Sequence, residues 1–319
     1  MLVSRVSGVR IEAIASTLPS GSRRGANGMM HFVADELQTT SDLGFDAAER
    51  IIKEKSLSRD QVGILLFGSR TPDYRSPNTA AILQGRLGLS VDCVCFDTNV
   101  GANGFIKMVQ VAAATLANSN TDHALVVVGD TPSKLHNNDP ETHFEISDAA
   151  TAVLLTKSES AMLEFTSYSA GTYYKASYLR QGGFRDFDPG APFDGSNTEN
   201  FVVRSDKDYL SSFYENALPV IQSVQASVES LLVNSNILNN LELEDRFIEH
   251  RNVVADASEL PLLLQNLIAE GLTDTDKIGF LTAGEGMALM AMTLNHKPQV
   301  LKTNHTTDFF PDYQVSHQM

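Results

Sequence analysis

The two cysteines, Cys93 and Cys95, are the side chains in this sequence best suited to attack a carbonyl carbon or to bind a metal ion. Both lie in the apolar run VDCVCF (91–96), which predicts a strand. A nucleophilic thiol would instead need a site that stabilises the thiolate, such as the start of a helix. No other cysteine or histidine stands at ligand spacing from this pair, so we predict neither a metal site nor a disulfide framework. The absence of a disulfide framework indicates a reducing compartment.

A glycine-rich turn, Gly101-Ala102-Asn103-Gly104, separates that strand from an alanine-rich segment with apolar residues at helical intervals. A second such turn, Gly284-Glu285-Gly286, lies between two apolar runs near the C-terminal end. Glycine permits close backbone approach, so both turns are predicted to lie where backbone segments pack tightly.

The elements that must position these turns alternate along the chain, which is typical of a layered α/β fold. The predicted strands are the start of the chain and 63–67, 91–96, 124–128, 150–155, 277–281 and 287–294. The predicted helices are 79–87, 104–117, 212–232 and 256–270. The segment 165–205 is rich in Gly, Asp, Ser, Tyr and Pro and predicts a long surface loop. This pattern divides the chain into halves at 1–160 and 161–319.

Composition limits the possible functions. The 319 residues are 42% hydrophobic and 20% charged, as in ordinary globular proteins, and the net charge is −15. An acidic surface repels phosphate backbones, so nucleic acid is not an expected ligand. No run of about 18 apolar residues predicts a membrane span, and the first residues predict a strand rather than a signal peptide. We therefore expect a cytoplasmic protein.

Four motifs between residues 68 and 155 resemble β-ketoacyl-ACP synthase III: SRTPDYRSPNTAAILQGRLGL, FDTNVGANGF, ALVVVGDTPSK and FEISDAATAVLL. They occur in the order and at the spacing of that family. The resemblance implies a thiolase-like fold: α/β, five-layered (α-β-α-β-α), built from two duplicated halves and usually dimeric. Members of the family move an acyl group from CoA or an acyl carrier protein onto a cysteine and need no cofactor.

The resemblance also assigns the catalytic positions, and none holds its reactive residue. Ala102 stands at the cysteine position in FDTNVGANGF, and a methyl group cannot form a thioester. The family's His, in a His-Gln-Ala-Asn element that opens a helix after a strand, aligns with Val224. The family's Asn aligns with Val254, counted back from Pro261. Valine has no donor for an oxyanion hole. Ala102 alone would also be compatible with an engineered trap for substrate.

Other residues near these positions are candidates for the pocket. They are Asn99, Asn103, Phe105, His250, Gly284, Glu285 and Gly286. A relocated chemistry would use Glu285, Asp148 or His250. We expect the protein to bind neither a metal ion nor a cofactor.

Three hypotheses follow. In the first, the chain is an inactive subunit that pairs with an active ketosynthase, as a heterodimer or heterotetramer, in an acyl-condensing or acyl-transfer complex of secondary-metabolite type. In the second, it is an acyltransferase or decarboxylase with relocated catalytic residues, acting on acyl-CoA or acyl carrier protein. In the third, it is a homodimer that binds an acyl chain without reacting.

Overall fold

The computed structural model describes residues 2–25, 28–134, 146–178, 204–205, 207–234, 237, 255–269, 277–284 and 288–309. Its strands are β1 Leu2–Pro19, β2 Ser22–Arg24, β3 Met30–Phe32, β4 Val62–Gly68, β5 Val94–Thr98, β6 His123–Asp130, β7 Ala149–Ser169, β8 Ser177–Tyr178, β9 Arg204–Ser205, β10 Ser230–Val233, β11 Ile278–Gly284, β12 Ala288–Leu294, β13 Gln299–Val300 and β14 Asn304–Thr306. Its helices are α1 Thr40–Glu54, α2 Thr79–Arg86, α3 Gly104–Ala117, α4 Lys207–Gln225 and α6 Glu259–Ala269, with short 3-10 helices η1 Arg59–Gln61, η2 Pro132–Lys134, η3 Gly171–Ala176 and η5 Asp256–Ser258.

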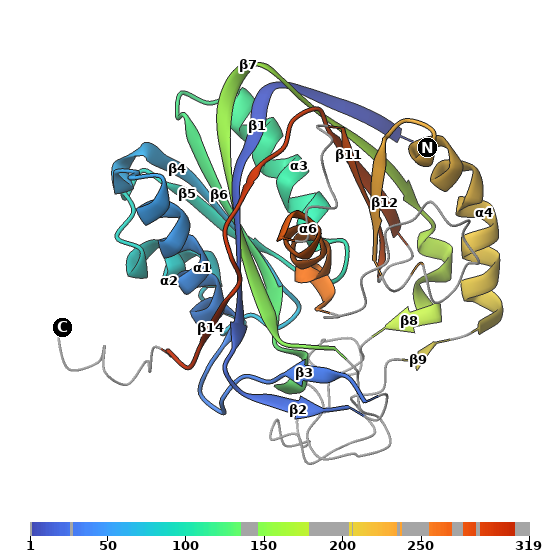
Figure 1. Ribbon diagram of the computed structural model, residues 1–319, viewed down its shortest axis with the longest axis horizontal. Coiled ribbons are helices and arrows are strands. Elements are labelled where there is room, and N and C mark those ends of the chain that lie inside the picture. Colours follow the sequence, from blue (N-terminus) through green and yellow to red (C-terminus); the bar gives the residue numbers. More distant parts are fainter. Residues whose placement is uncertain are drawn as a thin grey trace.

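Two long strands, β1 and β7, run through both halves of the sheet (Figure 1). The last part of β1 and the first part of β7 extend one half, in the order β5-β4-β6-β7-β1. The other ends of the same strands extend the second half, in the order β10-β11-β12-β7-β1. β4, β5 and β6 are parallel. The continuous apolar sequences of β4 and β6 favour this arrangement, because both faces of these two strands are buried.

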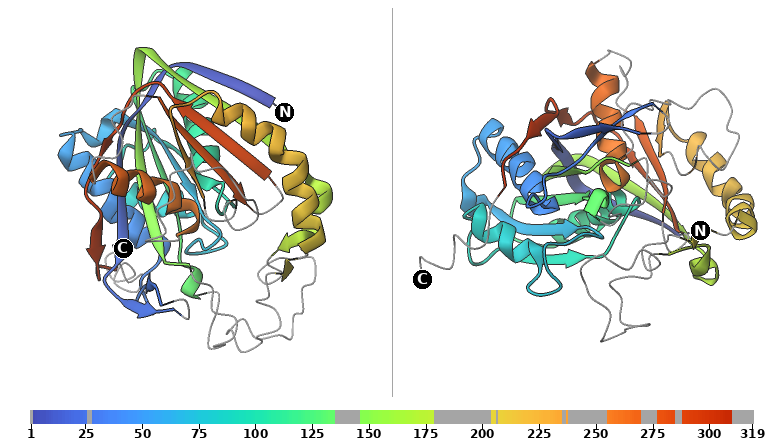
Figure 2. Two further views of the ribbon diagram at one scale, coloured as in Figure 1. Left: turned by 45° about the vertical axis from the view of Figure 1, so that its right-hand side comes forward. Right: turned by 90° about the horizontal axis from the view of Figure 1, so that it is seen from below.

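Helices cover both half-sheets and fill the space between them, as the views in Figures 1 and 2 show. α1 and α2 pack on the outer face of the first half-sheet, α4 packs on the outer face of the second, and α3 and α6 lie in the middle. Alternate residues of β4 separate two of these layers: Ile64 and Leu66 face the middle, whereas Leu65 and Phe67 face α1 and α2. The five layers α-β-α-β-α are the predicted architecture.

The boundaries of several predicted elements shift. The division predicted at residue 160 falls inside β7, which is continuous from Ala149 to Ser169. The prediction of a loop over 165–205 was wrong at its start, because residues Phe165 to Ser169 pair with β12. Residues 179–203 of that segment lie outside the described residues. The helix predicted over 212–232 ends at Gln225, and Ser230 starts β10. An apolar segment of mixed periodicity does not mark that change from helix to strand.

Candidate functional site: the turn before α3

Ala102 lies in the turn that joins β5 to α3, at the start of the central helix. It is 3% exposed, and the next residue, Asn103, is the N-cap of α3. The Gly104 N–H donates to the Gly101 carbonyl at 2.6 Å, which closes the turn. The side chain of Asn103 makes no capping hydrogen bond, so it does not compete for the N–H groups that open α3. These groups favour negative charge, which is the setting that activates a thiol; here the side chain is a methyl group.

Asn103 points across to the second half of the sheet. Its Nδ2 donates to the Ala288 carbonyl at 2.9 Å, and the residue is 2% exposed. Its Oδ1 is buried and accepts no hydrogen bond in the structure. A buried acceptor without a donor costs about 1–3 kcal/mol, so the contact with Ala288 is made at a cost.

β11 also contacts this turn through a side chain. The Thr282 hydroxyl donates to the Ala102 carbonyl at 3.0 Å, and both residues are buried. At the end of β10, the amide of Asn234 pairs with Ala283 in both directions, at 3.0 and 3.1 Å. The Asn234 side chain thus forms the same two hydrogen bonds that a backbone amide would form, and it extends the β10–β11 ladder by one position. The turn therefore rests on a rigid strand end.

Among the candidates from the sequence, Gly284 lies against Asn103. A Cβ atom added at Gly284 would be 3.0 Å from Asn103 Nδ2. Asn99 is exposed, and Phe105 is fully buried with its ring 5.4 Å from that of Phe280 in the middle layer. Phe105 thus belongs to the hydrophobic core of the middle layer. His250, Val254, Glu285 and Gly286 lie outside the described residues.

The structure does not bring Val224 to Ala102. Val224 lies in the last turn of α4. It belongs to the hydrophobic cluster of the outer layer that α4, β10, β11 and β12 form. The prediction that it opens a helix after a strand was wrong. The alignment relied on Gln225-Ala226, which match the Gln-Ala of the family's His-Gln-Ala-Asn element, and this short match was misleading. The residue that follows an apolar strand in this region is Asn234, after β10. The run Leu231-Leu232-Val233 was the sequence signal for it.

The segment that follows Val254 does reach the site. Ala257 approaches the first turn of α3 closely: a Cβ atom added at Gly104 would be 3.2 Å from the Ala257 Cβ. Ser258 donates to the Val128 carbonyl at 3.3 Å and so attaches η5 to β6. These small residues let three segments meet at the start of α3.

Asp148, a candidate for relocated chemistry, is fully occupied as a structural residue. Its Oδ1 accepts from the Ser133 N–H at 2.9 Å, and its Oδ2 accepts from the Ala34 N–H at 2.7 Å and from the Ser133 hydroxyl at 2.5 Å. Burial raises the pKa of this carboxyl, and these hydrogen bonds and Lys134 partly offset the rise. Asp148 therefore joins three segments instead of offering a free base.

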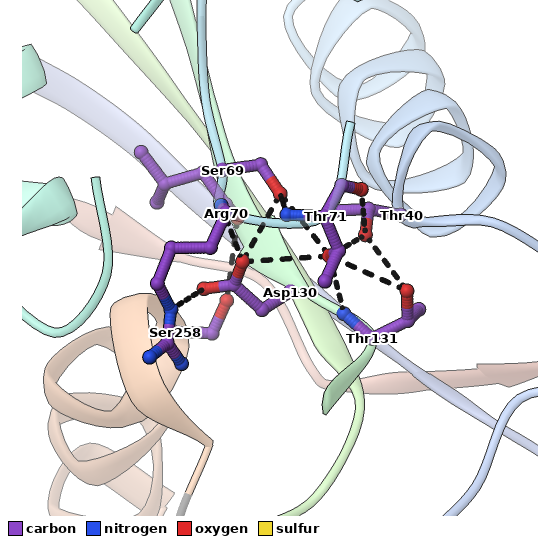
Figure 3. A network of polar contacts seen from close by, with 8 residues as sticks. Thr40, Ser69, Arg70, Thr71, Asp130, Thr131 and Ser258 are labelled. Atoms are coloured by element: carbon purple, nitrogen blue, oxygen red, sulfur yellow. Dashed lines mark hydrogen bonds and ion pairs between the residues drawn. The ribbon is translucent and has the colours of Figure 1, made fainter. Parts of the chain in front are cut away.

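The neighbouring carboxylate Asp130 was not singled out from the sequence. It is 1% exposed at the end of β6 and accepts from the Arg70 N–H at 2.7 Å and the Ser69 hydroxyl at 3.1 Å (Figure 3). Thr71, beside it, joins the hydroxyl groups of Thr40 and Thr131 at 2.9 and 3.3 Å. This polar network ties α1, β4 and β6 together beside η5.

Neither cysteine lies at the start of α3, where a thiol would be activated. Cys93 precedes β5 and is buried, and burial raises its pKa to about 11, with a smaller contribution from Cys95. Burial and the charge of Asp97 also raise the pKa of Cys95. Both thiols therefore remain protonated at neutral pH. In the part of the chain that the structure describes, no group of His, Cys, Asp and Glu side chains is arranged to hold a metal ion.

Comparison with known proteins agrees with this geometry. Residues 96–173 match the family described as 3-oxoacyl-[acyl-carrier-protein (ACP)] synthase III. A β-ketoacyl-ACP synthase III of Xanthomonas campestris is 35% identical over 130 residues, which are 40% of this chain and 39% of the relative. The enzyme of the same name from Caldanaerobacter subterraneus is 32% identical over 156 residues, 48% of this chain and 47% of the relative. The matches thus span less than half the length of these curated relatives.

The solved structures extend the likeness to nearly the whole chain. A 3-oxoacyl-(acyl-carrier protein) synthase of Burkholderia xenovorans superposes with a TM-score of 0.83 at 23% identity, over 96% of this chain and 99% of that one. A 3-oxoacyl-[acyl-carrier-protein] synthase III of Aquifex aeolicus gives a TM-score of 0.71 at 19% identity, over 90% and 99%. The protein therefore has the thiolase fold. Its similarity in sequence is to β-ketoacyl-ACP synthase III, over rather less than half of its length.

Among the described helices, none is both long and apolar enough to span a membrane.

Proposed function

We propose that this chain is a non-catalytic ketosynthase III-like subunit that pairs with an active ketosynthase in an acyl-condensing or acyl-transfer complex. The observation that carries the proposal is Ala102, a buried methyl group at the start of α3, where a thiol would be activated. Without that thiol, no acyl-enzyme forms by the mechanism of the family that the chain resembles.

The contacts around Ala102 support a structural role. Thr282 and Asn103 hold the turn through contacts to two strands, and glycines lie at the close approaches. A chain that keeps the support and lacks the reacting group remains able to complete an oligomer. Relocated catalysis receives less support, because the carboxylate of Asp148 is saturated with hydrogen bonds.

The proposal is tested by co-expressing the full chain with each cysteine-containing ketosynthase that its gene neighbourhood encodes. We expect a stable complex of the two chains in native mass spectrometry. We also expect acylation of the partner alone when the complex is incubated with radiolabelled acetyl-CoA. A chain that stays unpaired, or an acyl label on a side chain of this protein, would overturn the proposal.

A further inference from the structure

The segment between β4 and α2, residues 69–78, is attached to α1 by a polar cluster that contains two carboxyl groups and one guanidinium group. Asp42 of α1 accepts from Arg86 of α2, with 2.9 Å between Oδ1 and Nη1. In the segment itself, Asp73 Oδ2 accepts from the Ser41 hydroxyl at 2.6 Å. Arg86 also donates to Ser41 Oγ at 3.1 Å, so the serine links the guanidinium group to Asp73.

The two carboxyl groups of this cluster are not equivalent. Asp42 is 4% exposed, and its Oδ2 accepts from the N–H and the hydroxyl of Thr39 at 2.8 and 3.1 Å. Asp73 Oδ1, in contrast, is buried and accepts no hydrogen bond from any described residue. A carboxylate oxygen that has left water without gaining a donor is costly. The ionised form is therefore better satisfied at Asp42 than at Asp73.

The hydroxyl groups of the cluster form a chain that fits a protonated Asp73. Ser41 Oγ lies 3.1 Å from Thr39 Oγ1, and the Thr39 hydroxyl lies within donating distance of Asp42. When Asp73 carries a proton, it can donate to Ser41, Ser41 to Thr39 and Thr39 to Asp42, because each hydroxyl both donates and accepts. One carboxylate then faces one guanidinium group. When Asp73 is ionised, Ser41 donates to it instead, and two carboxylates share that guanidinium group.

The surroundings of Asp73 favour its neutral form. Burial raises the pKa of this carboxyl above its ordinary value of 3.8; the hydrogen bonds of the two hydroxyl groups oppose the rise, the charge of Asp42 adds to it, and Arg86 lowers it. The groups that face Asp73 are thus Thr39, Ser41 and Asp42 of α1 and Arg86 of α2, and Lys134 of η2 acts on Asp42 in turn. Stability from the neutral form is complete below pH 3.8 and is lost as the pH rises through the folded pKa.

We propose that Asp73 is a proton-sensitive contact that fixes the segment 69–78 to α1 when it is protonated and loosens it when it is ionised. The same segment has a second attachment, where Arg70 and Thr71 bind Asp130 and Thr40 beside η5 (Figure 3). Ionisation of Asp73 thus acts on the end of the segment nearer to α2. This switch goes beyond the function proposed above and does not depend on it.

The test compares urea unfolding of the full-length wild type, Asp73→Asn and Asp92→Asn at pH 5 and pH 7.5. Asp73→Asn has the shape of the carboxyl group and cannot ionise, so its midpoint should exceed that of the wild type at pH 7.5, by a margin that shrinks at pH 5. Asp92→Asn is the matched control, because Asp92 is exposed just before β5, and it should follow the wild type at both pH values. An equal margin for Asp73→Asn at both pH values would overturn the proposal.

Hydrogen exchange gives a second readout that a merely structural residue would not affect. After correction for the intrinsic effect of pH, protection of amides 71, 73 and 74 in the wild type should fall at least about threefold between pH 5 and pH 7.5. In Asp73→Asn it should stay constant. If the wild type keeps its protection, or if Asp73→Asn loses protection as the wild type does, the inference fails.

Discussion

The side chain of Asn103 occupies the space beside the α-carbon of Gly284. The N-cap residue of α3 and the last residue of β11 therefore pack directly on each other. Asn103 also donates to Ala288, the first residue of β12. One amide therefore joins the start of the central helix to both strands of the β11–β12 pair. The site is held mainly by this contact and by the Thr282 hydroxyl on Ala102.

Gly284→Ala should destabilise the protein, because the new methyl group would be 3.0 Å from Asn103 Nδ2. The expected loss is about 1–3 kcal/mol, typical of an overpacked core position. Asn103→Ala should lose less than about 1–3 kcal/mol, because the unpaired Ala288 carbonyl costs that amount while removal of the unsatisfied Asn103 Oδ1 offsets part of it. The double variant should lose less than the sum, since removing the amide makes room for the methyl group. Urea unfolding of the four proteins measures this coupling, and strictly additive losses would contradict it.

Ala102→Cys should restore a reactive thiol but not a complete enzyme. The new side chain would lie at a helix start whose N–H groups have no side-chain cap, which favours the thiolate. Incubation with acetyl-CoA should then add one acetyl group, seen as a mass increase that is absent in the wild type. Ala102→Ser is the matched control, because a hydroxyl of the same shape has no low pKa and should remain unmodified. An unmodified Ala102→Cys protein would show that the turn no longer activates a thiol.

The two natural cysteines should react slowly with iodoacetamide at pH 7.5. Only the thiolate reacts, and burial raises the pKa of Cys93 to about 11, so its thiolate fraction at this pH is below that of a free cysteine. Alkylation of Cys93 in the folded protein should be at least about ten times slower than that of free cysteine, and it should accelerate as the pH rises. Mass spectrometry of timed samples measures the rates. Equal alkylation rates of Cys93 in the folded and the urea-unfolded protein would be incompatible with a buried thiol.

Glu12 should stabilise the protein only above acidic pH. Burial acts to raise its pKa, but ion pairs with Lys55 and Arg10 outweigh that effect and lower it below 4.5. A group whose folded pKa is lowered contributes stability above its unfolded pKa and loses it as the pH falls through the folded pKa. Glu12→Gln should therefore cost up to about 1 kcal/mol at pH 7, since the pair is partly solvated, and almost nothing at pH 3. Unfolding curves at both pH values would detect the difference; an equal loss at both would contradict the ion-pair origin.

The sequence predicted the N-terminal half of the architecture better than the site. The buried strands β4, β6 and the first part of β7 are continuous apolar runs, and α3 has clear helical spacing, so local pattern and tertiary position agree. The turn that contains Ala102 lies where the sequence predicts it, because a glycine-rich segment between a strand and a helix marks its position; the catalytic assignment of Ala102 stays a prediction. The ladder from β1 to β14 could not be predicted, because it joins residues almost 300 positions apart through backbone groups alone.

The second half was harder for a physical reason. Val224 was predicted to start a helix. It lies instead near the end of α4, which ends one residue later at Gln225, and its side chain packs in the outer layer. Nothing local in the sequence separates a helix end from a helix start when an apolar strand follows within a few residues. Asn103 and Asn234 were likewise missed as supports, because their partners Ala288 and Ala283 contribute only carbonyl and N–H groups, which leave no mark in the sequence.

The path of β7 has a mechanical consequence. Since β1 and β7 cross from one half-sheet into the other, two fragments cut near residue 160 could separate only by breaking hydrogen bonds in both half-sheets, and they would not be two intact domains. Neither fragment would retain a complete sheet, because residues 2–7 complete the second and residues 299–306 complete the first. The two halves are thus interlocked, and heat or urea should melt them in a single transition.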